Sequence, residues 1–238
     1  MAVLTATPAP QRPAPARKSW WRRPWIGPLA LVVLAFLAFS LPPYLSLDPA
    51  NSRVPAPEGF PAHFYFLVGH VIFGSVAMLG GLLQIWPWLR RKYPVIHRNA
   101  GRAYVFAGVL PSGLMALIVG SESPFGPATR VSDVMLALIW IGCTWAGWRA
   151  VRERRFGDHR RWMIRSVALT FSIIVNRIIG VIAAMVLEPQ LQTTFGGSEV
   201  AFGQSIAAIS AWGSWTLVLV LTQLWLERRP SKKSAIAR

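Results

Sequence analysis

The sequence predicts an all-α, polytopic integral membrane protein of six transmembrane helices, whose second to fifth helices form a four-helix core bundle. Of its 238 residues, 53% are hydrophobic and only 14% are charged, whereas soluble domains carry roughly 25% charged residues. The long apolar segments are apolar on all sides instead of alternating, which excludes outer-membrane strands. The 25 Lys and Arg greatly outnumber the nine Asp and Glu, and they gather in particular connections between the apolar segments.

Six segments approach the roughly 20 apolar residues that a helix needs to cross a bilayer. They are Trp25–Leu45, Phe64–Trp86, Ala103–Gly120, Val134–Arg149, Ser166–Leu187 and Gln204–Leu226. Together they define a transmembrane domain over residues 25–226, with the first and sixth helices outside the core bundle. The first segment is too long for a signal peptide, so it is expected to be retained. Residues 1–24 are expected to be a disordered basic tail and interfacial anchor, and residues 227–238 a second basic tail.

The basic residues predict the orientation of the protein. Twenty-two of the 25 Lys and Arg lie in the two tails and in the second and fourth connections, whereas Arg53 and Arg130 lie on the opposite side and Arg177 lies within a span. Because cytoplasmic loops are enriched in Lys and Arg, both termini are expected in the cytoplasm. The expected partner is a bilayer with anionic headgroups, not nucleic acid, and the oligomeric state stays open.

The second and fourth connections have a similar order of residues. Each places tryptophans before a basic cluster and then a His-Arg pair, at His97-Arg98 and His159-Arg160. Two explanations stay open. One is an internal parallel repeat of two helical hairpins. The other is convergence, because Trp, Arg and His are all favoured at a membrane interface.

The same connections, with the helices beside them, carry a family resemblance. The relevant runs are His70-x3-Gly74-x2-Ala77-x3-Gly81-x2-Gln84, His97-Arg98-x2-Gly101-Arg102-x-Tyr104 and Asp158-His159-Arg160-Arg161-Trp162-Met163-Ile164-Arg165-Ser166. They resemble a bacterial family of predicted membrane proteins catalogued as domain of unknown function 2306, over about residues 65–190. The resemblance implies a helical fold in a bacterial inner membrane and no established activity. Asn176 departs from the family pattern, which has an apolar residue there.

Arg177 is the strongest pointer to function, because it lies 11 residues into the fifth span. An arginine near the bilayer centre costs about 2.5 kcal/mol or more, so it is expected to face the bundle interior. His70 lies on a similarly polar face of the second span. We therefore expect His70, Gln84, Asn176 and Arg177 to bind or pass a small anionic or polar solute. The alternative is structural, with Arg177 bound to backbone carbonyls, Asp133 or Glu188, and His70 bonded to a neighbouring helix.

Two further hypotheses belong to other classes. His97 and His159 are expected at one depth, as a single b-type haem with two axial imidazoles requires. The nearby basic residues would meet haem propionates or lipid headgroups; they are Arg98, Arg102, Arg160, Arg161 and Arg165. The third hypothesis is a structural or assembly partner without a ligand. No catalytic residue is predicted and the solute hypothesis requires no cofactor. The single cysteine, Cys143, excludes an internal disulfide and a cysteine-built metal site.

Overall fold

The computed structural model describes residues 25–228, and within this range every regular element is helical. The elements are α1 (Ile26–Ser40), α2 (Pro42–Leu45), the 3-10 turn η2 (Pro49–Asn51), α3 (His63–Ile85), α4 (Pro87–Lys92), α5 (Pro94–Ala103), the π-helical η3 (Tyr104–Val109), α6 (Leu110–Ser121), α7 (Pro127–Arg152), α8 (Phe156–Leu187), the 3-10 turn η4 (Glu188–Gln190) and α9 (Glu199–Glu227). This confirms the all-α fold. The predicted tail at 1–24 and residues 229–238 lie outside the described residues.

Five helices of the described chain are long and apolar enough to cross a membrane. They are α3, the continuous helix Pro94–Ser121, α7, the helix Phe156–Gln190 and α9. They correspond to the second to sixth predicted spans. Three of these helices begin well before the first residue of the predicted span. Each of the three has polar turns that precede its apolar segment. Pro94 and Pro127 fit these early starts, since proline is favoured in the first turn of a helix.

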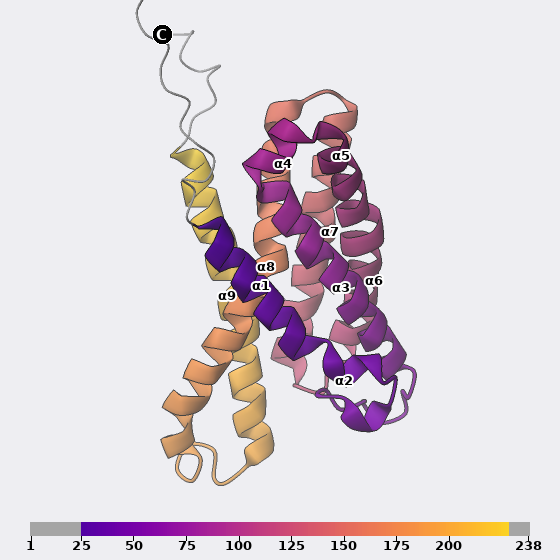
Figure 1. Cartoon of the computed structure of the whole chain (residues 1–238). Coiled ribbons are helices and arrows are strands. Elements are labelled where there is room, and N and C mark those ends of the chain that lie inside the picture. The colour runs from indigo at the N-terminus through magenta and orange to yellow at the C-terminus, as the bar shows by residue number, and fades with distance from the viewer. Residues whose placement is uncertain (1–24, 229–238) are drawn as a thin grey trace, which may run out of the picture.

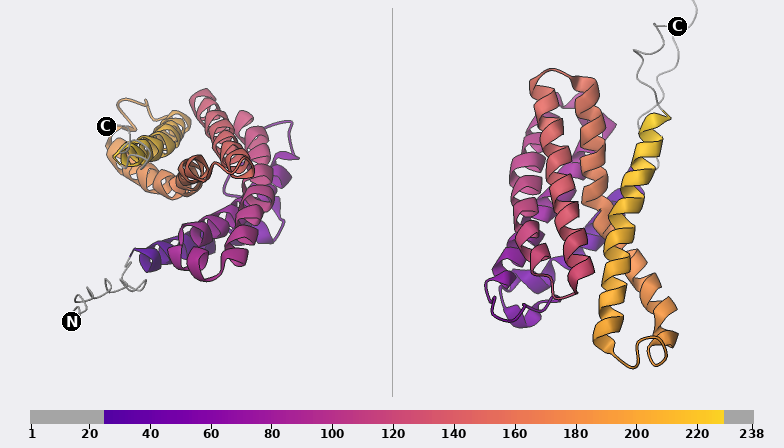
Figure 2. Two further views of the ribbon diagram at one scale, coloured as in Figure 1. Left: turned by 90° about the horizontal axis from the view of Figure 1, so that it is seen from above. Right: turned by 180° about the vertical axis from the view of Figure 1, so that it is seen from behind.

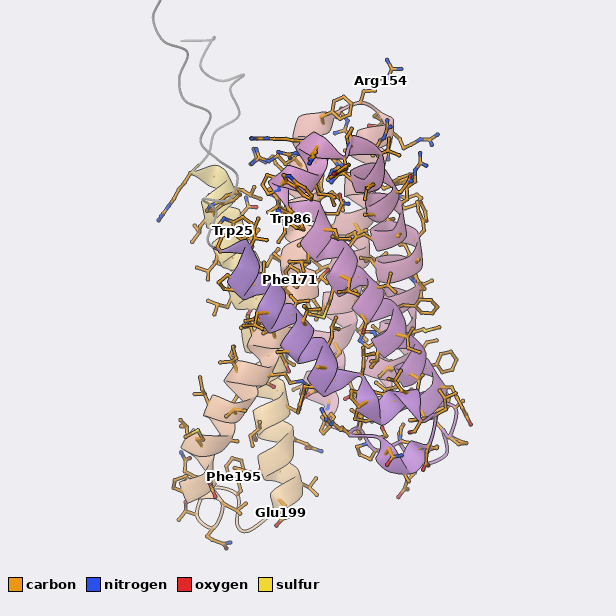
Figure 3. All side chains as sticks on the ribbon, viewed as in Figure 1. Trp25, Trp86, Arg154, Phe171, Phe195 and Glu199 are labelled. Atoms are coloured by element: carbon orange, nitrogen blue, oxygen red, sulfur yellow. The ribbon has the colours of Figure 1, made fainter. Side chains whose placement is uncertain are left out.

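The first predicted span is the part of the six-span prediction that the structure alters. Helix α1 has 15 residues, about 22 Å at 1.5 Å per residue, which is less than the hydrocarbon thickness of about 30 Å. The chain turns at Leu41, and Pro42 begins the short α2. In Figure 3, Trp25 at the start of α1 lies at a similar height to Trp86 after α3. Helix α1 is therefore a shorter apolar helix that slants across the bundle toward α2 (Figure 1).

Helices α5 and α6 are joined without a break by the π-helical segment η3. Pro111, one residue after the start of α6, lacks an amide hydrogen, and its ring crowds the carbonyl four residues earlier, at Ala107. A wider π-helical turn is a common way for a helix to accommodate such a disturbance. The segment rotates the residues that follow it, so the buried face of α6, which includes Ser112 and Gly113, is not in register with α5, which has no buried residue.

The predicted four-helix core is present, and it surrounds η3. Its buried apolar cluster joins α3, η3, α7 and α8 and also includes Trp215 of α9. A Cβ added at Gly108 would lie 2.9 Å from backbone atoms of Ala77, so only glycine allows α3 and η3 to approach this closely. Contrary to the prediction, the sixth helix is not outside the core. Helix α1 is peripheral and packs on α3 and α8 through Val33 and Leu37.

The two ends of the bundle differ in charge and in shape. The basic end carries α4, the start of α5 and the α7–α8 connection, where Arg154 is labelled in Figure 3. The far end carries α2, the start of α7 and the α8–α9 connection. Toward the far end, α8 and α9 lean away together from α3, α6 and α7 (Figures 1 and 2). The second half of α8 therefore lies outside the four-helix core.

Candidate functional site

A chain of buried hydroxyl groups links η3, α7 and α8 in the centre of the core. The Tyr104 hydroxyl lies 2.6 Å from Ser166 Oγ and 2.9 Å from Thr170 Oγ1. Trp140 Nε1 donates to Thr170 Oγ1 at 2.9 Å, and Thr144 Oγ1 lies 2.6 Å from Ser166 Oγ. Each of these polar groups has a partner, so the cluster fixes the register of the helices and leaves no group free for a ligand. The sequence analysis did not predict this cluster.

His70 joins two helices instead of lining a pocket with Arg177. Its Nδ1 lies 3.0 Å from both the carbonyl oxygen and the hydroxyl of Ser112, and the Ser112 hydroxyl donates to the His70 carbonyl at 2.9 Å. This is the interhelical bonding that the structural alternative expects. Gln84 lies elsewhere, because its Nε2 donates to the backbone oxygen of His97 at 2.8 Å. Gln84 was expected to share a polar interior with His70 and Arg177, but it lies beside His97.

Arg177 has different neighbours from His70. Its side chain is exposed, and the ionisable groups close enough to act on its charge are Tyr44 and Arg53. Within residues 25–228, Arg177 makes no side-chain hydrogen bond or ion pair; neither Asp133 nor Glu188 pairs with it. The half-buried Asn176 beside it also makes no side-chain hydrogen bond to the described chain. In the described residues, Arg177 therefore lacks the carboxylate partner, Asp133 or Glu188, that the structural alternative named.

The structure brings His97 and His159 together at the basic end. His97 lies in the first turns of α5 and His159 in the first turn of α8. The groups close enough to act on the charge of His97 are Arg90 and His159. Both histidines are half-buried. Two imidazoles from helices far apart in the sequence thus lie at the same end of the bundle, close enough for the charge of one to affect the other.

Each imidazole is held differently. Nδ1 of His159 lies 2.8 Å from the carbonyl oxygen of Gly147. Because a carbonyl can only accept, Nδ1 carries the hydrogen, which leaves Nε2 as the nitrogen with a free lone pair. Nδ1 of His97 is buried without a hydrogen-bond partner in the described chain. An unpaired buried polar nitrogen costs roughly 1–3 kcal/mol, so His97 is the less satisfied of the two.

Cations surround this histidine pair, and the acidic residues near it are already paired. Arg98, Arg102 and Arg160 are exposed. Glu153 binds Arg149 and Arg155, each at 2.7 Å, and Asp158 binds Arg155 at 2.7 Å. Hydrogen bonds from Arg149 and Arg155 hold the pKa of Glu153 below its usual value. The arginines beside the two histidines therefore remain available to an anionic ligand.

Two of the five predicted basic residues are less exposed. Arg161 is half-buried. Arg165 donates to Gln223 Oε1 at 2.6 Å and stacks over Trp162 at 4.8 Å from the ring centroid. Arg165 thus links α8 to α9 and is committed to the fold. No group of three or more His, Cys, Asp and Glu side chains in the described residues could hold a metal ion.

Comparison with known proteins gives one match. A family model described as "Predicted membrane protein (DUF2306)" matches residues 67–226, which is more than half of the chain. The match continues through α9, whereas the resemblance seen in the sequence ended near residue 190. No curated protein and no solved structure matches the chain. The chain therefore belongs to the family of predicted membrane proteins known as domain of unknown function 2306.

Proposed function

We propose that this multi-pass membrane protein binds one b-type haem between His97 and His159 and transfers electrons. The observation that carries the proposal is the convergence of the two imidazoles at the basic end of the core. They come from α5 and α8, two helices of the four-helix core. Membrane haems held by two histidines need such a pair on facing helices.

The partners of the two histidines support this assignment. A histidine that ligates iron or another metal commonly donates its second ring nitrogen to a backbone carbonyl, as His159 does to Gly147. Gln84 holds the backbone of His97, while the ring nitrogen Nδ1 is left without a partner. A half-buried histidine whose backbone is held but whose ring nitrogen Nδ1 has no partner in the described chain fits a residue that awaits a ligand.

The surrounding charges also fit a haem. Haem carries propionate carboxylates, and Arg98 and Arg160 directly follow the two histidines. Arginine binds carboxylates through paired, charge-assisted hydrogen bonds. When bound, the haem supplies one-electron redox chemistry. His97 and His159 would both hold the haem, an arrangement that would favour electron transfer over binding of oxygen.

The solute hypothesis has less support at His70. Its ring already bonds to Ser112, so it has less capacity to bind a solute. A purely structural role agrees with the satisfied hydroxyl chain around Tyr104.

We also propose that the basic end faces the cytoplasm of a bacterial inner membrane, because Lys and Arg are enriched on that side of membrane proteins. Reporter fusions test this orientation. Fusions at Gly59, Pro124 and Gly197 should report the periplasm, and fusions after Arg229 the cytoplasm. A fusion at the N-terminus tests whether α1 crosses the bilayer despite its length. A cytoplasmic signal at Gly197 would contradict the orientation.

Single substitutions of the four histidines test the haem. The purified protein, produced with ample haem, should show a Soret band and a reduced-minus-oxidised difference spectrum. His97→Gln and His159→Gln should each lower haem affinity by at least the roughly 10–100-fold seen when metal-site partners are removed. His63→Gln and His70→Gln are the matched controls and should retain haem, since neither residue lies in the pair.

Two results would contradict the proposal. One is wild-type protein that folds and remains free of haem when haem is plentiful. The other is a haem spectrum that survives both His97→Gln and His159→Gln, which would place the haem elsewhere. Gln84→Leu adds a finer test, because it removes the hydrogen bond to the His97 backbone. It should weaken haem binding less than either ligand substitution does.

A further inference from the structure

An open pocket lies at the far end, between the α2–α3 connection and the end of α6 (Figure 1). Its volume of about 610 Å³ is in the range of small-molecule sites, roughly 300–1,000 Å³. The residues that give it its chemical character are Glu58, Phe60, Leu117, Ile118, Ser121 and Glu122. The pocket therefore combines two carboxylates with an aromatic ring and aliphatic side chains.

The two carboxylates of the pocket have no cation to balance them. Glu58 and Glu122 are exposed, and in the part of the chain that the structure describes neither forms an ion pair. No Lys or Arg lines the pocket. Arg130, the cation nearest to Glu122 in the sequence, instead donates to the carbonyl of Ser123 at 2.8 Å. The pocket thus carries a net negative charge, which attracts cations.

The apolar part of the pocket continues toward the middle of the membrane. Leu117 and Ile118 line it from α6, and Leu114, one helical turn earlier than Ile118 on the same face, is exposed. Because α6 ends at the far end of the bundle, this apolar strip lies deeper than the two carboxylates. A ligand with a charged group and an apolar body would therefore have its charge at headgroup level and its body in the apolar phase.

A buried histidine adjoins both sides of the pocket. His63 is fully buried, and neither of its ring nitrogens makes a hydrogen bond to the described chain. Its ring lies edge-on to Phe60, with 6.1 Å between the centroids, and Glu122 is close enough to act on its charge. Since buried polar groups are nearly always hydrogen-bonded, this ring favours a polar partner supplied from outside the chain. Among the described residues, His63 and the two glutamates do not form a group that could hold a metal ion, which favours an organic cation.

We propose that this pocket binds an organic cation, with its ammonium group at Glu58 and Glu122 and its apolar body against Phe60 and the strip on α6. An ammonium group donates charge-assisted hydrogen bonds to carboxylates, and aromatic rings attract it as well. Soluble amines and the headgroup of phosphatidylethanolamine share this chemistry. The inference does not depend on the haem.

Calorimetric titration of the purified full chain in a neutral detergent tests the site, with 2-phenylethylamine as the probe. The wild type should bind it at least about ten-fold more tightly than 2-phenylethanol, which has the same apolar body and no charge. Glu58→Gln/Glu122→Gln should bind the amine at least about ten-fold more weakly than the wild type, because both charges are lost. Glu199→Gln is the matched control, since Glu199 is also an exposed carboxylate at the far end but lies at the start of α9, away from the pocket (Figure 3).

Three results would overturn the proposal. The first is a wild type that binds the amine no better than the alcohol, a comparison that holds even if the double variant fails to fold. The others are unchanged affinity in the double variant and an equal loss in Glu199→Gln. A competition experiment then separates the two sources of the ammonium group. Displacement of the amine by phosphatidylethanolamine, but not by phosphatidylglycerol, would identify a lipid headgroup, whereas displacement by neither would identify a soluble amine.

Discussion

The two halves of α8 lie in different surroundings, although the sequence gives them similar polar residues. In the first half, Ser166 and Thr170 belong to the buried hydroxyl chain, and Arg165 bonds to Gln223. In the second half, Asn176 and Arg177 make no side-chain hydrogen bond to the described chain, and most apolar side chains beyond them are exposed. Polar residues in the first half hold the fold together, whereas those in the second half are free for another molecule.

This difference arises because α8 leaves the four-helix core partway along its length (Figure 2). The first half packs against α7 and η3, while Gly180 in the second half faces Ser210 of α9. A face of a helix is therefore not a single environment. Polar side chains along α8 bond to neighbouring helices where the core covers them. Where the core does not cover them, they can bind another molecule.

The largest expected difference between the halves is in apolar packing. Leu169 is 3% exposed and Ile182 is 54% exposed. Leu169→Ala should lower the free energy of unfolding by about 2–5 kcal/mol, because it leaves a cavity in the core. Ile182→Ala should change it by less than about 0.5 kcal/mol. Thermal or denaturant unfolding in one detergent measures both, and equal losses would contradict the comparison.

A smaller effect is expected from the hydroxyl chain. Tyr104→Phe removes a hydroxyl that is bonded to Ser166 and Thr170 in the buried core. It should lower the free energy of unfolding by about 1–3 kcal/mol. Tyr93→Phe is the control, since Tyr93 is exposed at the basic end. If both variants unfold at the same temperature, the hydroxyl chain does not stabilise the core.

The smallest expected effect on the free energy of unfolding is the difference between substitutions of two arginines of α8, Arg165 and Arg177. Arg165→Gln loses the hydrogen bonds to Gln223 and the contact with Trp162, and should lower the free energy of unfolding by about 1 kcal/mol. Arg177→Gln should leave the free energy of unfolding unchanged within about 0.5 kcal/mol, because it loses no partner. Greater destabilisation by Arg177→Gln than by Arg165→Gln would assign Arg177 to the fold.

Much of the fold could be predicted from the sequence. Segments of about 20 apolar residues are long enough to form membrane helices, and the charge pattern separates the two ends. The helix boundaries were predicted less well, because hydropathy does not detect the polar turns before Ser166 in α8. The length of the first span was overestimated, since Pro42 and Pro43 interrupt a segment that is apolar throughout.

The site could be predicted only in part. The shared His-Arg order singled out His97 and His159, and both residues lie in first helical turns at the basic end. The partners of His70 and Gln84 could not be foreseen, because they depend on how α3 is rotated against α5 and α6. The π-helical segment η3 adds to this difficulty, since it shifts the face that α6 presents to α3. A regular helical periodicity drawn through residues 104–109 places Ser112 incorrectly.

The electron paramagnetic resonance spectrum of the oxidised, purified protein tests the central claim most directly. Two axial imidazoles give a low-spin ferric haem, because both are strong-field ligands. The wild type should therefore show a low-spin signal. His97→Gln or His159→Gln should abolish that signal or convert it to high spin, while His70→Gln should leave it intact. A wild-type spectrum with only high-spin haem, or protein saturated with haem that keeps its low-spin signal without His97 and His159, would contradict the account.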